Sequence, residues 1–138
     1  MKAENPRIII VDNQAMQFMP VFTRLEFEGI NCNVKNFYSA IQAVRGGNPL
    51  DYQILIIDAS CDINLRNYNN QSFSEWIKSQ NPEIIVIGTS VQRELLTDKI
   101  ANQVYDETLE FEVHEKFCDS FKRILIKYGF IQQEALLQ

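Results

Sequence analysis

The sequence has few cysteines, no long hydrophobic run and no excess of positive charge, and each of these absences excludes a class of protein. Cys32, Cys61 and Cys118 form no CxxC pair, and their odd number argues against a disulfide framework or a zinc site. No apolar run approaches the roughly 18 residues that would cross a bilayer. The 13 Lys and Arg residues against 18 Asp and Glu residues give a net charge of -5 without a basic cluster, which disfavours direct binding of nucleic acid. Protein partners are therefore favoured over nucleic acid or a membrane.

The length of 138 residues fits one domain, and the composition, 46% hydrophobic and 22% charged, is that of an ordinary globular protein. We expect a single domain over residues 1–138, with a core at about 7–130 and a C-terminal tail at 131–138. The start, MKAENP, lacks the hydrophobic stretch of a signal peptide. We therefore expect a cytoplasmic protein.

Three continuously apolar segments have the length of strands that are buried on both faces. They are RIIIVD (7–12), QILIID (53–58) and EIIVIG (83–88). Two further segments, 30–34 and 109–113, alternate apolar with polar residues. This alternation predicts edge strands with one face in water.

Segments with apolar residues three and four positions apart separate the strands and predict helices. One holds Leu95, Leu96 and Ile100, and the last holds Phe117 and Phe121. Alternating strands and helices predict an α/β fold in which parallel strands are joined by helices. With the alternating segments outermost, the five-stranded parallel sheet has the order 2-1-3-4-5, which is the doubly wound, flavodoxin-like fold with helices on both faces.

Two features fit this pattern less simply. Pro20 falls inside the first helical segment, so that helix either begins late with Pro20 in its first turn or is kinked. The segment CDINLRNYNNQS, residues 61–72, is predicted as an asparagine-rich loop that is longer than most strand-to-helix connections. Within it, Asp62 is interpreted as a solvated loop carboxylate, with a supplementary metal ligand as the alternative.

Polar residues stand at the predicted carboxyl ends of four strands, where doubly wound sheets bind their ligands. These residues are Asp12 with Asn13, Asp58, Thr89 with Ser90, and Lys116. By itself, Asp58 would be a strand-end aspartate that caps the following loop. The alternative is a common site, because all of these positions meet at one edge of the predicted sheet.

The pieces IIIVDN, LIIDAS, VIGTS and HEKF occur in the order and at about the spacing found in response-regulator receiver domains. The chain resembles an atypical or degenerate CheY-like member of that family from residue 7 to about 130. This resemblance implies two-component or phosphorelay signalling, with Asp58 as the phosphoacceptor and with Thr89 and Lys116 on the phosphoryl oxygens. It also implies a Mg²⁺ site made by the side chains of Asp12, Asn13 and Asp58 and by the carbonyl of Ser60.

Several positions depart from the family pattern. The family usually has two acidic residues after the first strand, whereas Asn13 follows Asp12 here. A pair of unit charges about 4 Å apart is worth roughly 4 kcal/mol at an effective dielectric constant near 20, so we expect weak Mg²⁺ binding. Phe117 replaces the proline after the lysine, Val113 replaces the usual aromatic residue, and the 61–72 loop replaces the usual residues after the phosphoacceptor.

These observations leave three functions open. In the first, the chain is a single-domain receiver that takes a phosphoryl group on Asp58 from a histidine kinase or a phosphotransfer protein, and then binds a downstream protein. It would have no enzymatic activity beyond gaining and losing that group, and it would form a homodimer, if any, through its fourth helix, fifth strand and fifth helix. In the second, it is a degenerate receiver that docks a partner without phosphate. The third, a small flavodoxin-like enzyme or ligand binder, is disfavoured because the sequence has no glycine-rich phosphate loop.

Overall fold

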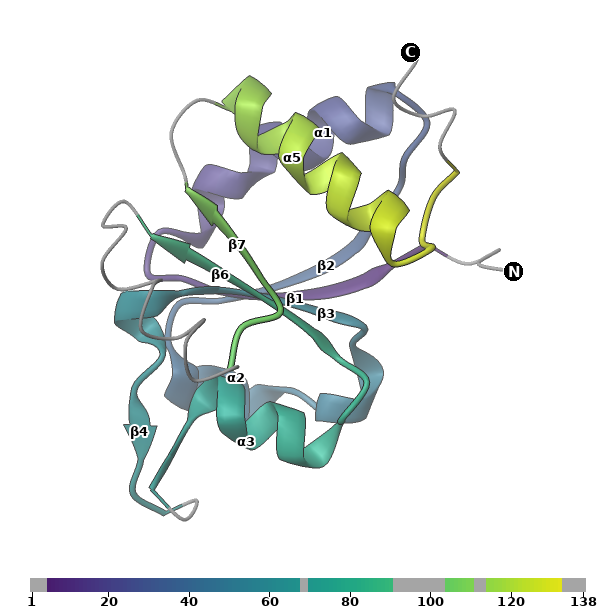
Figure 1. The fold of residues 1–138 in the computed structure, drawn as a ribbon. Helices are drawn as coiled ribbons and strands as arrows, with labels where there is room; N and C mark the ends of the chain where they lie inside the picture. The colour runs from purple at the N-terminus through teal and green to yellow at the C-terminus, as the bar shows by residue number, and fades with distance from the viewer. Residues whose placement is uncertain (1–4, 68–69, 91–103, 111–113, 133–138) are drawn as a thin grey trace.

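The computed structural model describes residues 5–67, 70–90, 104–110 and 114–132, and these residues form a parallel sheet between two layers of helices (Figure 1). The five strands lie in the order β2-β1-β3-β6-β7, and every neighbouring pair is parallel. Counted over the sheet alone, this is the predicted order 2-1-3-4-5, so the flavodoxin-like topology is confirmed. The strands are β1 (Arg7–Val11), β2 (Asn33–Phe37), β3 (Ile54–Asp58), β6 (Ile85–Ser90) and β7 (Glu107–Glu110).

The three central strands β1, β3 and β6 are the continuously apolar segments of the sequence. Successive side chains of a strand point to opposite faces of the sheet. Ile8 and Ile10 of β1 therefore join the core on one face, and Ile9 and Val11 join the core on the other. Strands that contribute to both cores need apolar residues at every position, which is why these runs are unbroken.

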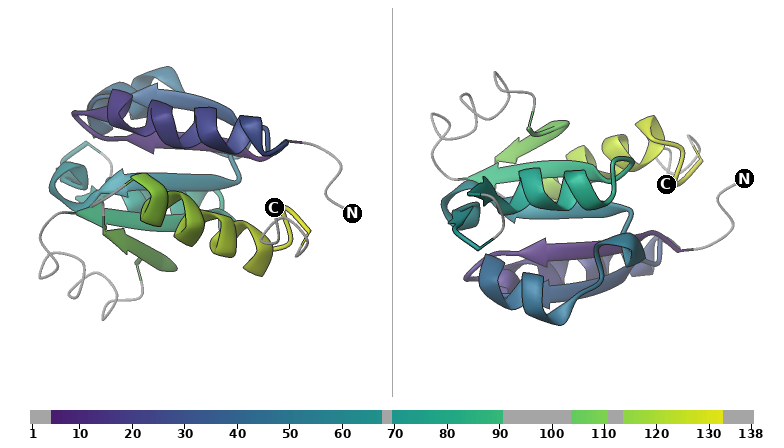
Figure 2. Two further views of the ribbon diagram at one scale, coloured as in Figure 1. Left: turned by 90° about the horizontal axis from the view of Figure 1, so that it is seen from above. Right: turned by 90° about the horizontal axis from the view of Figure 1, so that it is seen from below.

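Four of the described helices cover the two faces of the sheet, two on each (Figure 2). Helices α1 (Met19–Phe27) and α5 (His114–Lys127) pack on one face, where the rings of Phe22 and Phe121 meet edge to face at 5.8 Å. Helices α2 (Ala40–Gly46) and α3 (Phe73–Gln80) cover the other face. There the half-buried ring of Trp76 packs against Phe73 at a centroid distance of 5.7 Å.

Local signals set the ends of α1. A 3-10 turn, η1 (Ala15–Phe18), precedes it, and Pro20 lies in its first turn, so the late-start alternative is confirmed. At the other end Gly29 adopts a φ of 82°, and the amide of Ile30 donates to the carbonyl of Leu25 at 2.8 Å. This cap uses Ile30, so β2 begins three residues later than the alternating pattern predicted.

The segment 61–72, predicted as a loop, contains two short strands. After the 3-10 turn η3 (Ala59–Cys61) the chain forms a small antiparallel ribbon of β4 (Asn64–Leu65) and β5 (Gln71–Ser72). Its two-residue strands are too short to show alternation in the sequence. The 3-10 turn η2 (Pro49–Asp51) lies before β3.

Asp62 anchors the ribbon to the rest of the fold, and its interpretation as a solvated loop carboxylate is wrong. Only 7% of Asp62 is exposed, and its carboxylate accepts hydrogen bonds from the amide of Ser74 and the hydroxyl of Tyr105, each at 2.9 Å. The ring of Tyr105 lies over Gly88, where an added methyl group would overlap it. Burial, reinforced by Asp62, raises the pKa of Tyr105, which keeps the hydroxyl protonated as a donor.

The helix predicted from Leu95, Leu96 and Ile100 lies outside the described residues, as do Phe111 and Val113 of the predicted last strand. Among the helices that the structure describes, none is both long enough and apolar enough to span a membrane.

Candidate functional site

The carboxyl ends of β1, β3 and β6 lie side by side and carry polar residues to a common cavity. Val11 pairs with Ile57, and Asp58 pairs with Thr89, so the residues at these three strand ends are neighbours. The cavity has a volume of about 200 Å³. Its lining consists of Asp12, Asn13, Gln14, Gln17, Asp58, Ser60, Thr89 and Ser90.

Asp12 is a buried carboxylate. Among the described residues, no lysine or arginine forms an ion pair with it. It is 3% exposed and follows β1 directly. Its Oδ1 accepts a hydrogen bond from the amide of Gln14 at 2.8 Å, and its Oδ2 accepts one from Nε2 of Gln17 at 3.0 Å. Burial raises the pKa of Asp12, and the nearby charge of Asp58 raises it further. The ionised form therefore gains from any cation that enters the cavity.

Asp58 is half-buried at the end of β3 and serves as the N-cap of η3. Its Oδ1 accepts from the amide of Ser60 at 3.2 Å, and its Oδ2 accepts from the Ser60 hydroxyl at 3.0 Å. The capping role that the sequence suggested is thus observed. Each carboxylate oxygen has two lone pairs, so one on each remains available to a metal ion or an electrophile.

Thr89 supplies a hydroxyl group from the neighbouring strand. The residue is 2% exposed, lies in β6 directly beside Asp58, and lines the cavity. Within the part of the chain that the structure describes, its hydroxyl makes no hydrogen bond. The Thr89 hydroxyl could therefore donate a hydrogen bond to an oxyanion in the cavity.

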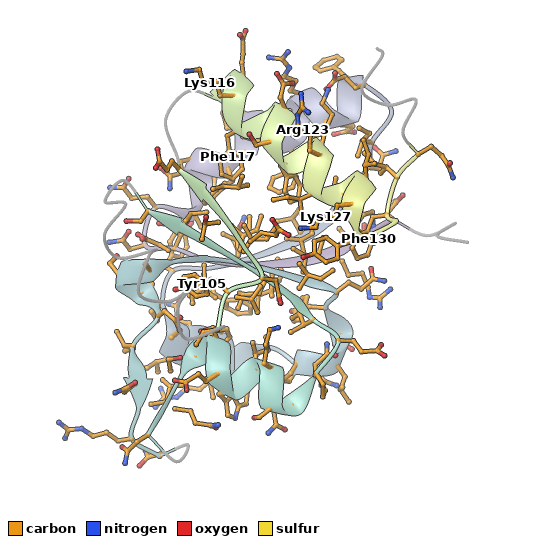
Figure 3. The ribbon with its side chains drawn as sticks, viewed as in Figure 1. Tyr105, Lys116, Phe117, Arg123, Lys127 and Phe130 are labelled. Carbon is orange, nitrogen blue, oxygen red and sulfur yellow. The ribbon has the colours of Figure 1, made fainter. Side chains whose placement is uncertain are left out.

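Lys116 does not end a strand, and the prediction that it does is wrong. Strand β7 ends at Glu110, and Lys116 lies in the first turn of α5. Figure 3 shows its side chain at the start of that helix, pointing away from the sheet. The helix buries Phe117 and Phe121, which lie one turn apart, against the sheet. Adjacent helical residues are turned by about 100°, so Lys116 falls on the exposed face.

The residues of the cavity fit a divalent cation of the Mg²⁺ kind. Two neighbouring carboxylates, Asp12 and Asp58, line the cavity, and no described lysine or arginine lines it with them. The amide oxygen of Asn13 and the exposed Ser60 supply further hard oxygen donors, the type that Mg²⁺ prefers. The set has only two acids, and no cluster of three or more acidic, histidine or cysteine ligands occurs among the described residues. It therefore suits a weakly held ion that keeps several waters.

Two of the lining residues, Gln14 and Gln17, were not anticipated from the sequence. The bond from Gln14 follows a common rule, since a strand-end aspartate often accepts from the amide two residues on. Gln17 reaches Asp12 only because η1 turns the chain back toward the strand end. No periodic pattern in the sequence predicts that turn.

Comparison with known proteins gives matches in structure only. No protein-family model matches the chain, and no curated protein sequence matches it. Among solved structures it is similar to the response regulator DrrB of Thermotoga maritima, an OmpR/PhoB homolog, with 19% identity and a TM-score of 0.62 over 91% of this chain. The chain spans only 54% of the length of DrrB.

Two shorter proteins match along nearly their whole length. A response regulator from Desulfuromonas acetoxidans has 19% identity and a TM-score of 0.63 over 87% of this chain and 96% of its own. A CheY-like receiver domain protein from Methanospirillum hungatei has 18% identity and a TM-score of 0.59 over 91% of this chain and 98% of its own. The fold of the chain is that of response-regulator receiver domains, as the sequence motifs predicted.

Proposed function

We propose that this chain is a receiver-type signalling module that accepts a phosphoryl group on Asp58 and acts by changing its affinity for another protein. The observation that carries the proposal is the joint position of Asp12, Asp58 and Thr89 around one cavity at the switch point of the sheet. The likeness of the fold to response regulators supports the same class of function. Two-component or phosphorelay signalling in the cytoplasm is the setting that this function requires.

The proposed transfer uses a carboxylate oxygen of Asp58 as the nucleophile. This oxygen forms a bond to phosphorus while the bond from phosphorus to a histidine nitrogen, or to the oxygen of a small acyl phosphate, breaks. The leaving group departs with the electron pair of that bond. Thr89 donates its hydroxyl to one phosphoryl oxygen and so stabilises the charge that moves onto the aspartyl phosphate.

Asp12, Asn13, Asp58 and the carbonyl of Ser60 would hold Mg²⁺. The ion, when bound, neutralises negative charge on the phosphoryl group. Asp12 keeps its carboxylate oriented through its bonds to Gln14 and Gln17. The phosphodonor in this proposal is a histidine kinase or a phosphotransfer protein. The protein that the phosphorylated chain binds is a downstream protein or a second copy of the chain.

A second candidate function is favoured by the position of Lys116. The resemblance to receivers implies a lysine on the phosphoryl group, but Lys116 lies on the outer face of α5 (Figure 3). Without that cation the phosphorylated state is less stable, and the scaffold would serve as a docking module that binds its partner without phosphate.

Amide NMR separates the two functions. The protein is titrated with Mg²⁺ and then with beryllofluoride or acetyl phosphate, and the Asp58→Asn variant is treated in the same way. For the phosphoacceptor we expect shifts at Asp12, Asp58 and Thr89 in the unmodified chain and none with Asp58→Asn. Lys116→Met is the matched control. Because Lys116 lies outside the cavity, its substitution should change the response by no more than about twofold, far less than removal of the nucleophile in Asp58→Asn.

No response at millimolar Mg²⁺ would refute phosphorylation and leave the docking module. A response abolished by Lys116→Met would show that this lysine reaches the phosphoryl group, and the role that we assign to the cavity alone would then be wrong.

A further inference from the structure

A cavity of about 330 Å³ lies between α2 and the first strand of the ribbon, and it shares no lining residue with the cavity of Asp12 and Asp58. Its floor is apolar. Ile41 is 49% exposed and Ile63 is 46% exposed, although both are large aliphatic residues, and Val44 and Leu65 lie beside them. Exposed aliphatic side chains that gather in one hollow mark a surface that gains from being covered.

The rim of this cavity is positively charged in a chain whose net charge is -5. Arg45 comes from the last turn of α2, and Arg66 follows β4. Both are exposed, and within the described ranges neither makes an ion pair or a hydrogen bond. The other lining residues are apolar or amides, and no described acid lines the hollow. The cavity therefore complements a ligand that carries both an apolar group and negative charge.

The backbone of the ribbon adds a third feature. The cavity is lined by the consecutive residues 63–67 and by no residue of β5. In the described structure β4 pairs with β5 alone, so the opposite edge of β4 has no strand beside it. An unpaired edge presents amide and carbonyl groups that an extended peptide can bond to (Figure 1, lower left).

We propose that the groove formed by Ile41, Val44, Ile63 and Leu65, with Arg45 and Arg66 at its rim, is a docking site for an extended acidic peptide segment of a partner protein. An apolar side chain of the peptide fills the hollow, and carboxylates on either side pair with the two arginines. A peptide explains the unpaired edge of β4 as well as the charge, whereas a small anionic ligand would use only the latter. The proposal does not depend on phosphorylation of Asp58.

The probe is a fluorescein-labelled peptide of about eight residues, which spans roughly 26 Å when extended and so covers the groove. One set alternates glutamate with leucine, isoleucine or phenylalanine, and two control sets carry glutamine or lysine in place of glutamate. Fluorescence anisotropy measures binding to the full chain. Amide NMR identifies the residues that respond.

The decisive variant is the double substitution Arg45→Glu with Arg66→Glu. Both positions are exposed, so the fold is retained, which circular dichroism checks. We expect binding of the acidic peptides to weaken by about tenfold or more, and rising salt to weaken binding to the unmodified chain. Arg123→Glu is the matched control, since Arg123 is an exposed arginine on α5, across the sheet, and makes no ion pair with the described residues. It should bind within about twofold of the unmodified chain.

A second variant, Ile41→Ser with Ile63→Ser, tests the apolar floor and should also weaken binding by about tenfold. The proposal is overturned if none of the acidic peptides shifts residues 41–45 or 63–67, if the glutamine set binds as well, or if Arg123→Glu weakens binding as much as the double variant. Concentration-dependent self-association that the double variant abolishes would also overturn it, by showing that the occupant is a second copy of the chain.

Discussion

Asp12 shows how a single residue of the cavity is held in a state that favours binding over stability. Its carboxylate is buried and lies near the charge of Asp58, and among the described residues it accepts hydrogen bonds from two neutral donors alone, Gln14 and Gln17. Two hydrogen bonds from neutral groups do not replace the hydration that a carboxylate loses on burial. The folded chain therefore disfavours the ionised form of Asp12, and a bound cation would relieve this.

The first prediction concerns the pH dependence of stability. An acid whose pKa is raised in the folded state weakens folding progressively as the pH rises from its ordinary value, 3.8, through the raised value, because the unfolded chain loses its proton first. Asp12→Asn removes this effect and keeps the acceptor for Gln14, while the amide of Gln17 can rotate to accept from the new amide. We expect the variant to unfold at higher urea concentration at pH 7, and at similar concentration near pH 4.

Urea titrations at several pH values without divalent ions measure this difference. Addition of Mg²⁺ should raise the midpoint of the unmodified chain and leave that of Asp12→Asn unchanged, because only the former holds the ion through this carboxylate. A variant that is less stable at pH 7 would show that Asp12 contributes more through its hydrogen bonds than burial of its charge costs.

At the scale of elements, α5 is attached to the sheet by an aromatic cluster. Phe121 is fully buried and contacts Phe22 of α1 and Phe117 of its own helix. Around this cluster, Lys122 is only 4% exposed and forms an ion pair with Glu28 at 2.9 Å. Hydrophobic contact supplies most of the attachment, since an ion pair contributes little once its desolvation is counted.

We predict that Phe121→Ala lowers the free energy of unfolding by about 3–5 kcal/mol, the usual cost of removing a buried ring. The matched control is Phe27→Ala, because Phe27 lies at the end of α1 with 88% of its surface exposed. That substitution should change stability by no more than about 0.5 kcal/mol. Chemical denaturation of both variants tests the pair, and equal losses would contradict the packing described.

The elements that the sequence predicted well are those in which burial alone decides the structure. The runs that became β1, β3 and β6 are apolar at every position, and Asp12, Asp58 and Thr89 were found because they stand where these runs end. Lys116 was misplaced because it was read as the end of the strand predicted over 109–113, whereas the apolar spacing from Phe117 onward already indicated helix. The β4–β5 ribbon could not be predicted, since Asp62 holds it through Tyr105, 43 residues away in the chain.

At the scale of the whole molecule, two helical layers share one sheet. Ile54 and Ile56 of β3 belong to the core under α1 and α5, and Leu55 and Ile57 belong to the core under α2 and α3. Neither layer can lose its packing without exposing one face of the same strands. The domain should therefore unfold as one cooperative unit.

Native-state hydrogen exchange tests this coupling. We predict that Phe121→Ala in one layer and Ile77→Ala in the other both speed exchange of the β1 and β3 amides, each in proportion to its loss of global stability of about 2–5 kcal/mol. Ile77 is 1% exposed and lies in α3, so the two changes are comparable in burial. Faster exchange confined to the helices of the mutated layer would indicate two independent units.

Trp76 is the only tryptophan of the chain, and it packs on Phe73 in the layer of α2 and α3. The opposite layer is built around Phe18, Phe117 and Phe121, and the fluorescence of phenylalanine is weak beside that of tryptophan. Tryptophan fluorescence therefore reports on one of the two helical layers. Excited selectively, the indole reports on the neighbourhood of the ribbon without any attached dye, whereas changes under α5 can be followed through Tyr128, which packs against that core.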